Sequence, residues 1–69
     1  MNIDNYQYII FWSDDDELFR GRVTEFPYLG AHGDTPDEAL AQIKKAVQGA
    51  IEIMQEKGNK VPEPIRSAK

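Results

Sequence analysis

A single long amphipathic stretch, beginning at Thr35, constrains the fold of this chain more than any other feature. Thr35 is a preferred helix N-cap, Pro36 suits the first helical position, and Glu38 can reach back to the cap and complete a capping box. Behind this start, apolar residues recur at helical spacing: Leu40, Ile43, Val47, Ala50, Ile51 and Met54. Gly58 is a typical residue for a helix end. The pattern predicts one helix over residues 36–57 with a single apolar stripe.

The residues before the helix predict a small antiparallel sheet. Residues 6–12 are dense in aromatic and β-branched side chains, and residues 18–25 alternate well enough for a second strand. Between them, the polar run at residues 13–17 favours a turn, because Asp and Ser side chains bond to their own backbone. Pro27 removes a ladder donor and is expected to end the second strand near the preceding residue. Residues 29–33 predict a short third strand.

The size of the chain limits how stable this fold is by itself. A chain of 69 residues forms one domain, and such a domain buries only about 60% of its unfolded surface. It has no cysteine, so disulfides and thiolate zinc sites are excluded, and a reducing cytoplasm is the expected location. Residues 1–5 carry no signal-peptide pattern, and no membrane association is expected. We expect one α+β domain of β-β-β-α order over residues 1–64, a flexible tail at 65–69, and a homo-oligomer.

The length of the turn decides which side chains share a face of the sheet. A five-residue turn places Trp12 opposite Leu18, Ile10 opposite Arg20 and Tyr8 opposite Arg22. The face toward the helix is then wholly apolar, with room for the helix at the glycine, and carries Ile9, Phe11, Phe19, Gly21 and Val23. The opposite face carries Tyr6, Tyr8, Ile10, Trp12, Leu18, Arg20, Arg22 and Thr24.

This opposite face is rich in large side chains for a surface that faces only water. Tyr, Trp and Arg are the residue types enriched at protein interfaces. We therefore predict that the face serves self-association or partner binding, through Tyr6, Tyr8, Ile10, Trp12, Arg20 and Arg22. The alternatives are that the C-terminal tail covers half of it, or that its aromatics are merely scattered exposed residues.

The charge of the chain is unevenly distributed. The formal net charge is −4, with a net of −7 over residues 1–40 and of +3 over residues 41–69. An acidic sheet end repels nucleic acid and suits a basic protein partner, although ordinary solvation explains surface charge equally well. The predicted turn, with Asp14, Asp15, Asp16 and Glu17, is the densest acidic run.

Catalytic and cofactor sites find little support in the sequence. His32 is the only histidine, and it has no nucleophile or second metal ligand at a recognised spacing. The consecutive acids of the turn lack the alternate spacing and distal Glu of a calcium loop. The glycine-rich run at residues 30–33 lacks the spacing of a nucleotide fingerprint. We expect no enzyme activity, no metal and no cofactor.

Several segments, in order, resemble the HicB antitoxin family. Together with an aromatic-led first strand, the segments cover residues 6–64. They are Phe19-Arg20-Gly21-Arg22-Val23, Glu25-Phe26-Pro27, Ala31-His32-Gly33-Asp34-Thr35, Glu38-Ala39 and Val61-Pro62-Glu63-Pro64. The resemblance implies a partial RNase H-like fold without the catalytic acids, and dimers or higher oligomers. It also implies that the protein neutralises a small basic HicA-type toxin, an mRNA interferase, by binding it.

Together, the residues and the resemblance favour a non-enzymatic binding module. The acidic residues 14–17 would steer a basic partner, and Phe26 and Tyr28 would supply apolar contacts. Many HicB proteins continue into a DNA-binding domain, and only residues 65–69 follow the resemblance here, so no direct DNA binding is expected of this chain.

Three alternatives remain open at this stage. The chain could be a solitary HicB-like protein with another partner. Aromatics beside Arg on an open sheet face are also typical of single-strand RNA-binding modules, although the acidic charge opposes that reading. A metal-assisted nuclease is suggested by fold analogy alone, without a visible carboxylate cluster.

Overall fold

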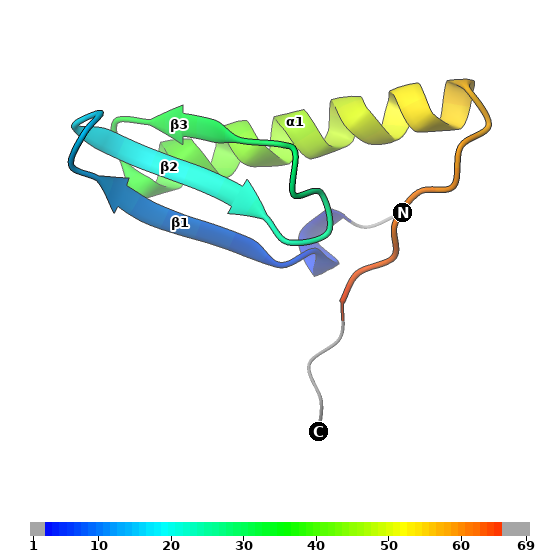
Figure 1. The fold of residues 1–69 in the computed structure, drawn as a ribbon, viewed down its shortest axis with the longest axis horizontal. Helices are drawn as coiled ribbons and strands as arrows, with labels where there is room; N and C mark the ends of the chain where they lie inside the picture. The colour runs from blue at the N-terminus through cyan, green and yellow to red at the C-terminus, as the bar shows by residue number, and fades with distance from the viewer. Residues whose placement is uncertain (1–2, 66–69) are drawn as a thin grey trace.

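One helix lies across one face of a three-stranded antiparallel sheet (Figure 1). The structure, a computed structural model, describes residues 3–65. Its elements are a 3₁₀ turn η1 (Ile3–Asn5), the strands β1 (Tyr8–Ser13), β2 (Leu18–Val23) and β3 (Ala31–Gly33), and the helix α1 (Pro36–Glu56). The expected α+β class and strand order are confirmed. Of the flexible tail predicted at residues 65–69, the structure describes residue 65, whose amide donates to Glu25 at 2.7 Å; residues 66–69 lie outside the described residues.

The hairpin has a different register from the predicted one. Ser13 is the last residue of β1 and pairs with Leu18, so the loop contains four residues and not five. Its last residue, Glu17, closes the loop in the left-handed region, with φ of 55°. Trp12 therefore pairs with Phe19, and every other pair shifts by one residue. Because side chains alternate along a strand, this shift exchanges the faces of β1 relative to β2.

Both faces of the sheet therefore carry different residues from those predicted. Tyr8 and Ile10 lie on the helix side with Val23 and pack against the core, whereas the prediction placed them on the open face. Ile9 and Phe11, predicted as core, are exposed. The face away from the helix carries Ile9, Phe11, Leu18, Arg20, Arg22 and His32.

The helix begins as its capping sequence predicts. The hydroxyl of Thr35 accepts a hydrogen bond from the Glu38 amide, and Pro36 is the first helical residue. The capping box, however, is not closed on the cap residue itself: the Glu38 carboxylate accepts from the amide of Asp34, one residue earlier. At the far end Lys57 is the C-cap, and Gly58 follows with φ of 75°, a conformation that favours glycine.

Two glycines let the helix backbone approach the sheet. A Cβ built on Gly33 would lie 2.6 Å from the Ala39 amide nitrogen, and one on Gly21 would lie 3.0 Å from the Ala39 carbonyl oxygen. Ala39 itself is fully buried. The predicted room for the helix at Gly21 is thus confirmed, and Gly33 provides a tighter contact beside it.

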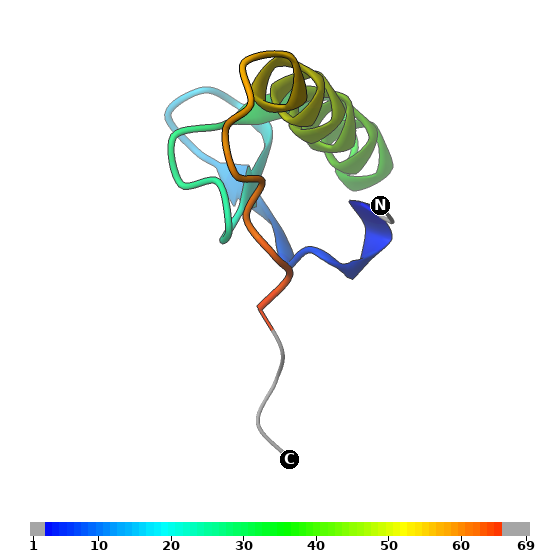
Figure 2. The same ribbon diagram turned by 90° about the vertical axis from the view of Figure 1, so that its right-hand side faces the viewer.

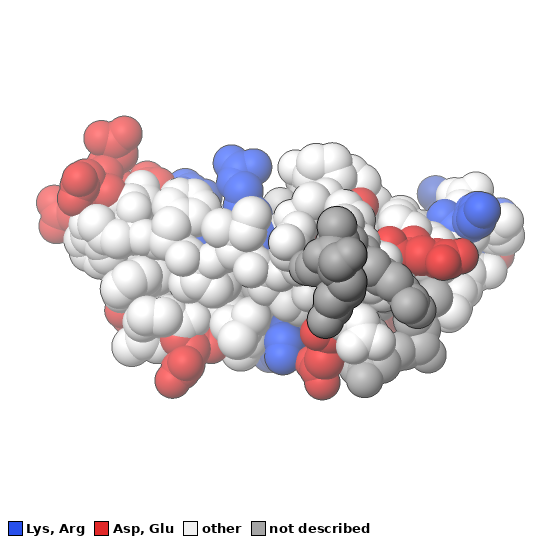
Figure 3. Space-filling model, turned by 90° about the horizontal axis from the view of Figure 1, so that it is seen from below, with Lys and Arg blue, Asp and Glu red and all other residues white. Residues whose placement is uncertain are grey.

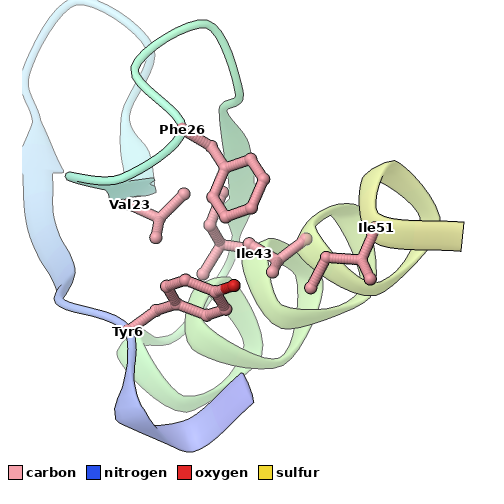
Figure 4. Packing of buried hydrophobic residues seen from close by; sticks show 6 residues of the cluster. Tyr6, Val23, Phe26, Ile43 and Ile51 are labelled. Carbon is pink, nitrogen blue, oxygen red and sulfur yellow. The ribbon is translucent and has the colours of Figure 1, made fainter. Parts of the chain in front are cut away.

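The core lies between the sheet and the middle part of the helix. Phe26 is fully buried and its ring meets that of Tyr6 edge to face at 5.2 Å (Figure 4). From the helix side, Ile43, Val47 and Ile51 complete the buried cluster.

The chain after the helix returns along this end of the core (Figure 2). The Tyr6 hydroxyl donates to the carbonyl oxygen of Pro62 at 2.6 Å, and Val61 packs against the buried cluster. As far as residue 65, the C-terminal segment therefore closes one end of the core, and Ile9 and Phe11 on the open sheet face stay exposed.

Equal changes at two glycines should have opposite effects on stability. Gly33→Ala places a Cβ against backbone atoms, so we expect it to lower the free energy of unfolding by about 2 kcal/mol or more. Gly49→Ala adds the same methyl group in open space within α1 and should raise this energy by about 1 kcal/mol. Urea unfolding of both variants measures the difference, and equal shifts would contradict the close helix–sheet approach.

Tyr6 should make the fold sensitive to alkali. Burial, together with the nearby Glu25 and Glu63 carboxylates, raises the pKa of Tyr6 above its ordinary value of 10.0. The neutral phenol therefore contributes stability that is present below pH 10 and is lost as the pH rises through the folded-state pKa. Tyr6→Phe should cost about 1 kcal/mol at neutral pH by losing the bond to Pro62, and should lose less stability in alkali. Urea unfolding midpoints of Tyr6→Phe and of the unmodified chain, measured from neutral pH to above pH 10, test this prediction.

Candidate functional site

The topology brings two acidic segments to one end of the molecule. Gly33, at the end of β3, pairs with Phe19 near the start of β2, so the helix start lies at the same end as the hairpin loop. This end, here called the acidic end, carries Asp14, Asp15, Asp16, Glu17, Asp34, Asp37 and Glu38. Red atoms gather at its hairpin loop, on the left of Figure 3. Among these acidic residues, the sequence predicted only those of the loop as partner contacts, and the fold places the helix start at the same end.

The hairpin loop is held in shape by its own side chains. The Trp12 indole donates to Asp14 at 2.7 Å, and the Ser13 hydroxyl donates to Asp16 at 3.1 Å. Arg20 donates through Nε to the same Asp16 oxygen at 2.7 Å. Because a fixed loop loses less entropy on binding, it can present its remaining charges in a defined arrangement.

The Arg20 contact sets the charge state of Asp16. Hydrogen bonds from Arg20 and, secondarily, Ser13 lower the pKa of Asp16 below its ordinary value of 3.8. Both side chains of the ion pair are considerably exposed, so the pair adds little to stability. Its effect is to hold the Asp16 side chain in place and to offset one of the negative charges of the loop. Among the described residues, Asp15 and Glu17 have no such partner.

A groove leaves the acidic end along the helix. It has a volume of about 820 Å³ and lies between β3 and α1, with Asp34, Glu38, Gln42 and Lys45 on its walls. An apolar groove of about 460 Å³ continues it beyond Lys45, lined by Tyr28, Leu29, Ala46, Ala50, Ile53 and Met54. We call the first the edge groove and the second the apolar groove. The sequence pattern did not reveal either, since each needs residues from the helix and from the segment before it.

Several residues predicted to contact a partner lie elsewhere. Phe26 is fully buried, so its predicted role as an apolar contact is wrong, whereas Tyr28 beside it is 66% exposed. Tyr6 is buried as well, and Tyr8 and Ile10 face the helix, so none of these three belongs to the open sheet face.

The remaining members of the predicted aromatic and Arg face are divided between the two sides of the sheet. Trp12 is exposed but lies on the helix side, at the acidic end, with its ring edge to face with Phe19 at 5.1 Å. Arg20 and Arg22 are on the open face, next to Phe11 and Ile9 across the hairpin. The residues of β1 are large and apolar on both sides of the strand, so the sequence did not show which of them face outward.

The described part of the chain has neither a metal-binding cluster nor a membrane-spanning helix. Between residues 3 and 65, no group of three or more His, Asp or Glu side chains is arranged to hold a metal ion. In the same part of the chain, no helix combines the length and the apolar character needed to cross a membrane.

Comparisons with protein-family models, with curated proteins and with solved structures found no match to this chain.

Replacing Arg20 should change the titration of Asp16. In Arg20→Gln the strongest hydrogen bond to the carboxylate is lost, so we expect its titration midpoint to rise. The stabilising effect of ionised Asp16 is present above its ordinary pKa and is lost as the pH falls through the folded-state value. Carboxyl NMR titration measures the midpoint. The matched control is Arg22→Gln on the same strand, and an equal rise there would contradict the assignment.

Proposed function

We propose that this chain is a HicB-like antitoxin, a non-enzymatic module that neutralises a small basic HicA-type mRNA interferase by binding it. The single observation that carries the proposal is the acidic end, where the hairpin loop and the helix start present their carboxylates together. A toxin that binds RNA needs a basic surface, and a fixed acidic surface competes for it. The motif order that resembles HicB gives the partner its identity.

The chemistry of the acidic end favours binding over catalysis. Asp14 and Asp16 are used in the hydrogen bonds that shape the loop. Glu38 serves as the helix-start acceptor for the Asp34 amide. Carboxylates committed in this way act as fixed charges, and they do not converge on one point where a metal or a substrate atom could sit. The partial RNase H-like fold without catalytic acids, which the resemblance to HicB implies, agrees with this use.

The RNA-binding alternative has lost part of its support. It depended on an open face with several aromatics, but Tyr6 and Tyr8 face the core, and Arg20 is tied to Asp16. Phe11 is the aromatic side chain that β1 offers on the open face. A solitary HicB-like role with another basic protein would use the same acidic end.

Neutralising the hairpin loop should weaken capture of a basic partner. The chain is co-expressed with the product of the adjacent reading frame, which the proposal requires to be a short basic protein. The variant Asp14→Asn, Asp15→Asn, Glu17→Gln removes charge but keeps the Asp16–Arg20 pair. We expect slower association, by about tenfold at low salt, and a smaller dependence of the rate on salt.

A variant with the same change in net charge serves as the control. Glu52→Gln, Glu56→Gln, Glu63→Gln neutralises exposed residues at and beyond the other end of α1. It should leave association nearly unchanged. The antitoxin proposal fails if no basic protein is retained at low salt, or if both variants slow association equally. Salt-dependent binding of single-stranded RNA by the unmodified chain would favour the RNA-binding alternative instead.

A further inference from the structure

The strand β3 has a free backbone edge. It is the last strand of the order β1-β2-β3, and no described element pairs with its outer side. Thr24 donates to the Gln7 carbonyl oxygen, which extends the β1–β2 ladder by one pair. Along an antiparallel strand, residues whose backbone bonds to one neighbour alternate with residues whose backbone bonds to the other. Because Thr24 bonds toward β1, Phe19 and Gly21 bond toward β3. The backbone N–H and C=O of His32 therefore point outward, away from the sheet.

The free edge has a defined limit at the acidic end. The next outward-pointing amide along the chain is that of Asp34, and the Glu38 carboxylate already accepts it at 2.7 Å. An added strand can thus bond to His32 but meets the capped helix start beyond it. This limit sets how far toward the acidic end backbone pairing can extend.

The two grooves provide a floor for such a strand. The edge groove runs beside β3 at the acidic end, and the apolar groove continues along α1 past Lys45 and Ala46, which line both. Three small residues of α1 leave room for a strand above the helix on this side: Ala46, Gly49 and Ala50. Ile53 lies outside the core stripe of the helix and is 55% exposed at the rim. Side chains that alternate along an added strand would point into this floor.

We infer that the β3 edge and the two grooves bind an extended segment of the basic partner, which adds to the sheet as a fourth strand. The identity of the occupant rests on the proposed function. The segment would place Lys or Arg beside Asp34 and Glu38, and apolar side chains between Tyr28 and Ile53. Backbone hydrogen bonds to His32 supply affinity. The acidic edge groove and the apolar groove determine which side chains the bound segment must carry.

Charge decides between this occupant and a second copy of the chain. Each copy has a formal net charge of −4, so two copies repel at long range, whereas a basic segment is attracted to the acidic end. Lys45 is the one basic side chain on the walls of both grooves, and it lies between the acidic and apolar parts. It would face the middle of the segment, where a carbonyl oxygen or a polar side chain fits.

The test uses a synthetic peptide as probe, so that it does not depend on finding the natural partner. One half of the peptide alternates Arg with Thr and the other half alternates Val with Thr. A control peptide of the same charge carries proline at alternate positions and cannot pair with an edge. We expect the first peptide to shift the NMR signals of residues 30–34 and 45–54 and to slow hydrogen exchange at the His32 amide. The control should bind weakly or not at all.

Two variants separate backbone pairing from simple charge attraction. His32→Pro removes the outward donor, and proline is tolerated where the N–H faces solvent at a sheet edge. It should weaken peptide binding about tenfold, since hydrogen bonds to the edge are lost, while His32→Ala keeps the donor and should bind nearly as well. Ile53→Lys, at an exposed position, should also weaken binding by placing charge at the apolar end. Far-UV circular dichroism confirms that each variant is folded.

Specific outcomes overturn the inference. It fails if the folded His32→Pro and Ile53→Lys variants bind as the unmodified chain does, if both peptides bind equally, or if only residues 14–17 respond. Protection of the His32 amide that grows with protein concentration, without peptide, would assign the edge to a second copy and also overturn it. If these tests fail while the loop variant still weakens capture of the toxin, the proposed function stands alone. If no basic protein is captured but the peptide binds as expected, the edge inference stands alone.

Discussion

The close approach of the helix to the sheet at Ala39 underlies the rest of this structure. Gly33 and Gly21 lack the side chains that would hold α1 away, so its first turn rests almost on the backbone of β3 and β2. From this contact the helix crosses the sheet, and Ile43, Val47 and Ile51 fill the space behind it with Phe26 and Tyr6. The same contact places the helix start next to the hairpin loop. The charge distribution of the acidic end is therefore a consequence of backbone packing.

Features that depend on neighbouring residues could be predicted from the sequence. The N-cap at Thr35, the helix predicted at residues 36–57 and the strand positions follow from local propensity and spacing. The structure confirms them within two residues, with the helix at residues 36–56. Gly21 was identified as the place where the helix approaches. The acidic residues of the hairpin loop were also visible, because a run of like charge needs no fold to be recognised.

Features that depend on a single residue of register could not be predicted. No Asn-Gly or Asp-Gly pair marks the hairpin loop, and its left-handed residue is Glu17, which carries no sequence signal for that conformation. Tyr8, Ile9, Ile10 and Phe11 are all large and apolar enough for either face, so hydrophobicity did not select the register. The grooves could not be predicted either, because residues far apart in the sequence, such as Tyr28 and Ile53, line the same groove only in the folded chain.

Glu25 links the two ends of the chain. Its carboxylate accepts hydrogen bonds from the amide of Gln7, before β1, and from the amide of Ile65, after the helix. When either end frays, the carboxylate loses one of its two anchors and holds the other less firmly. Residues 7 and 65, far apart in the sequence, thus share one acceptor. A displacement of residue 65 can therefore reach the start of β1 through Glu25, without passing through the helix.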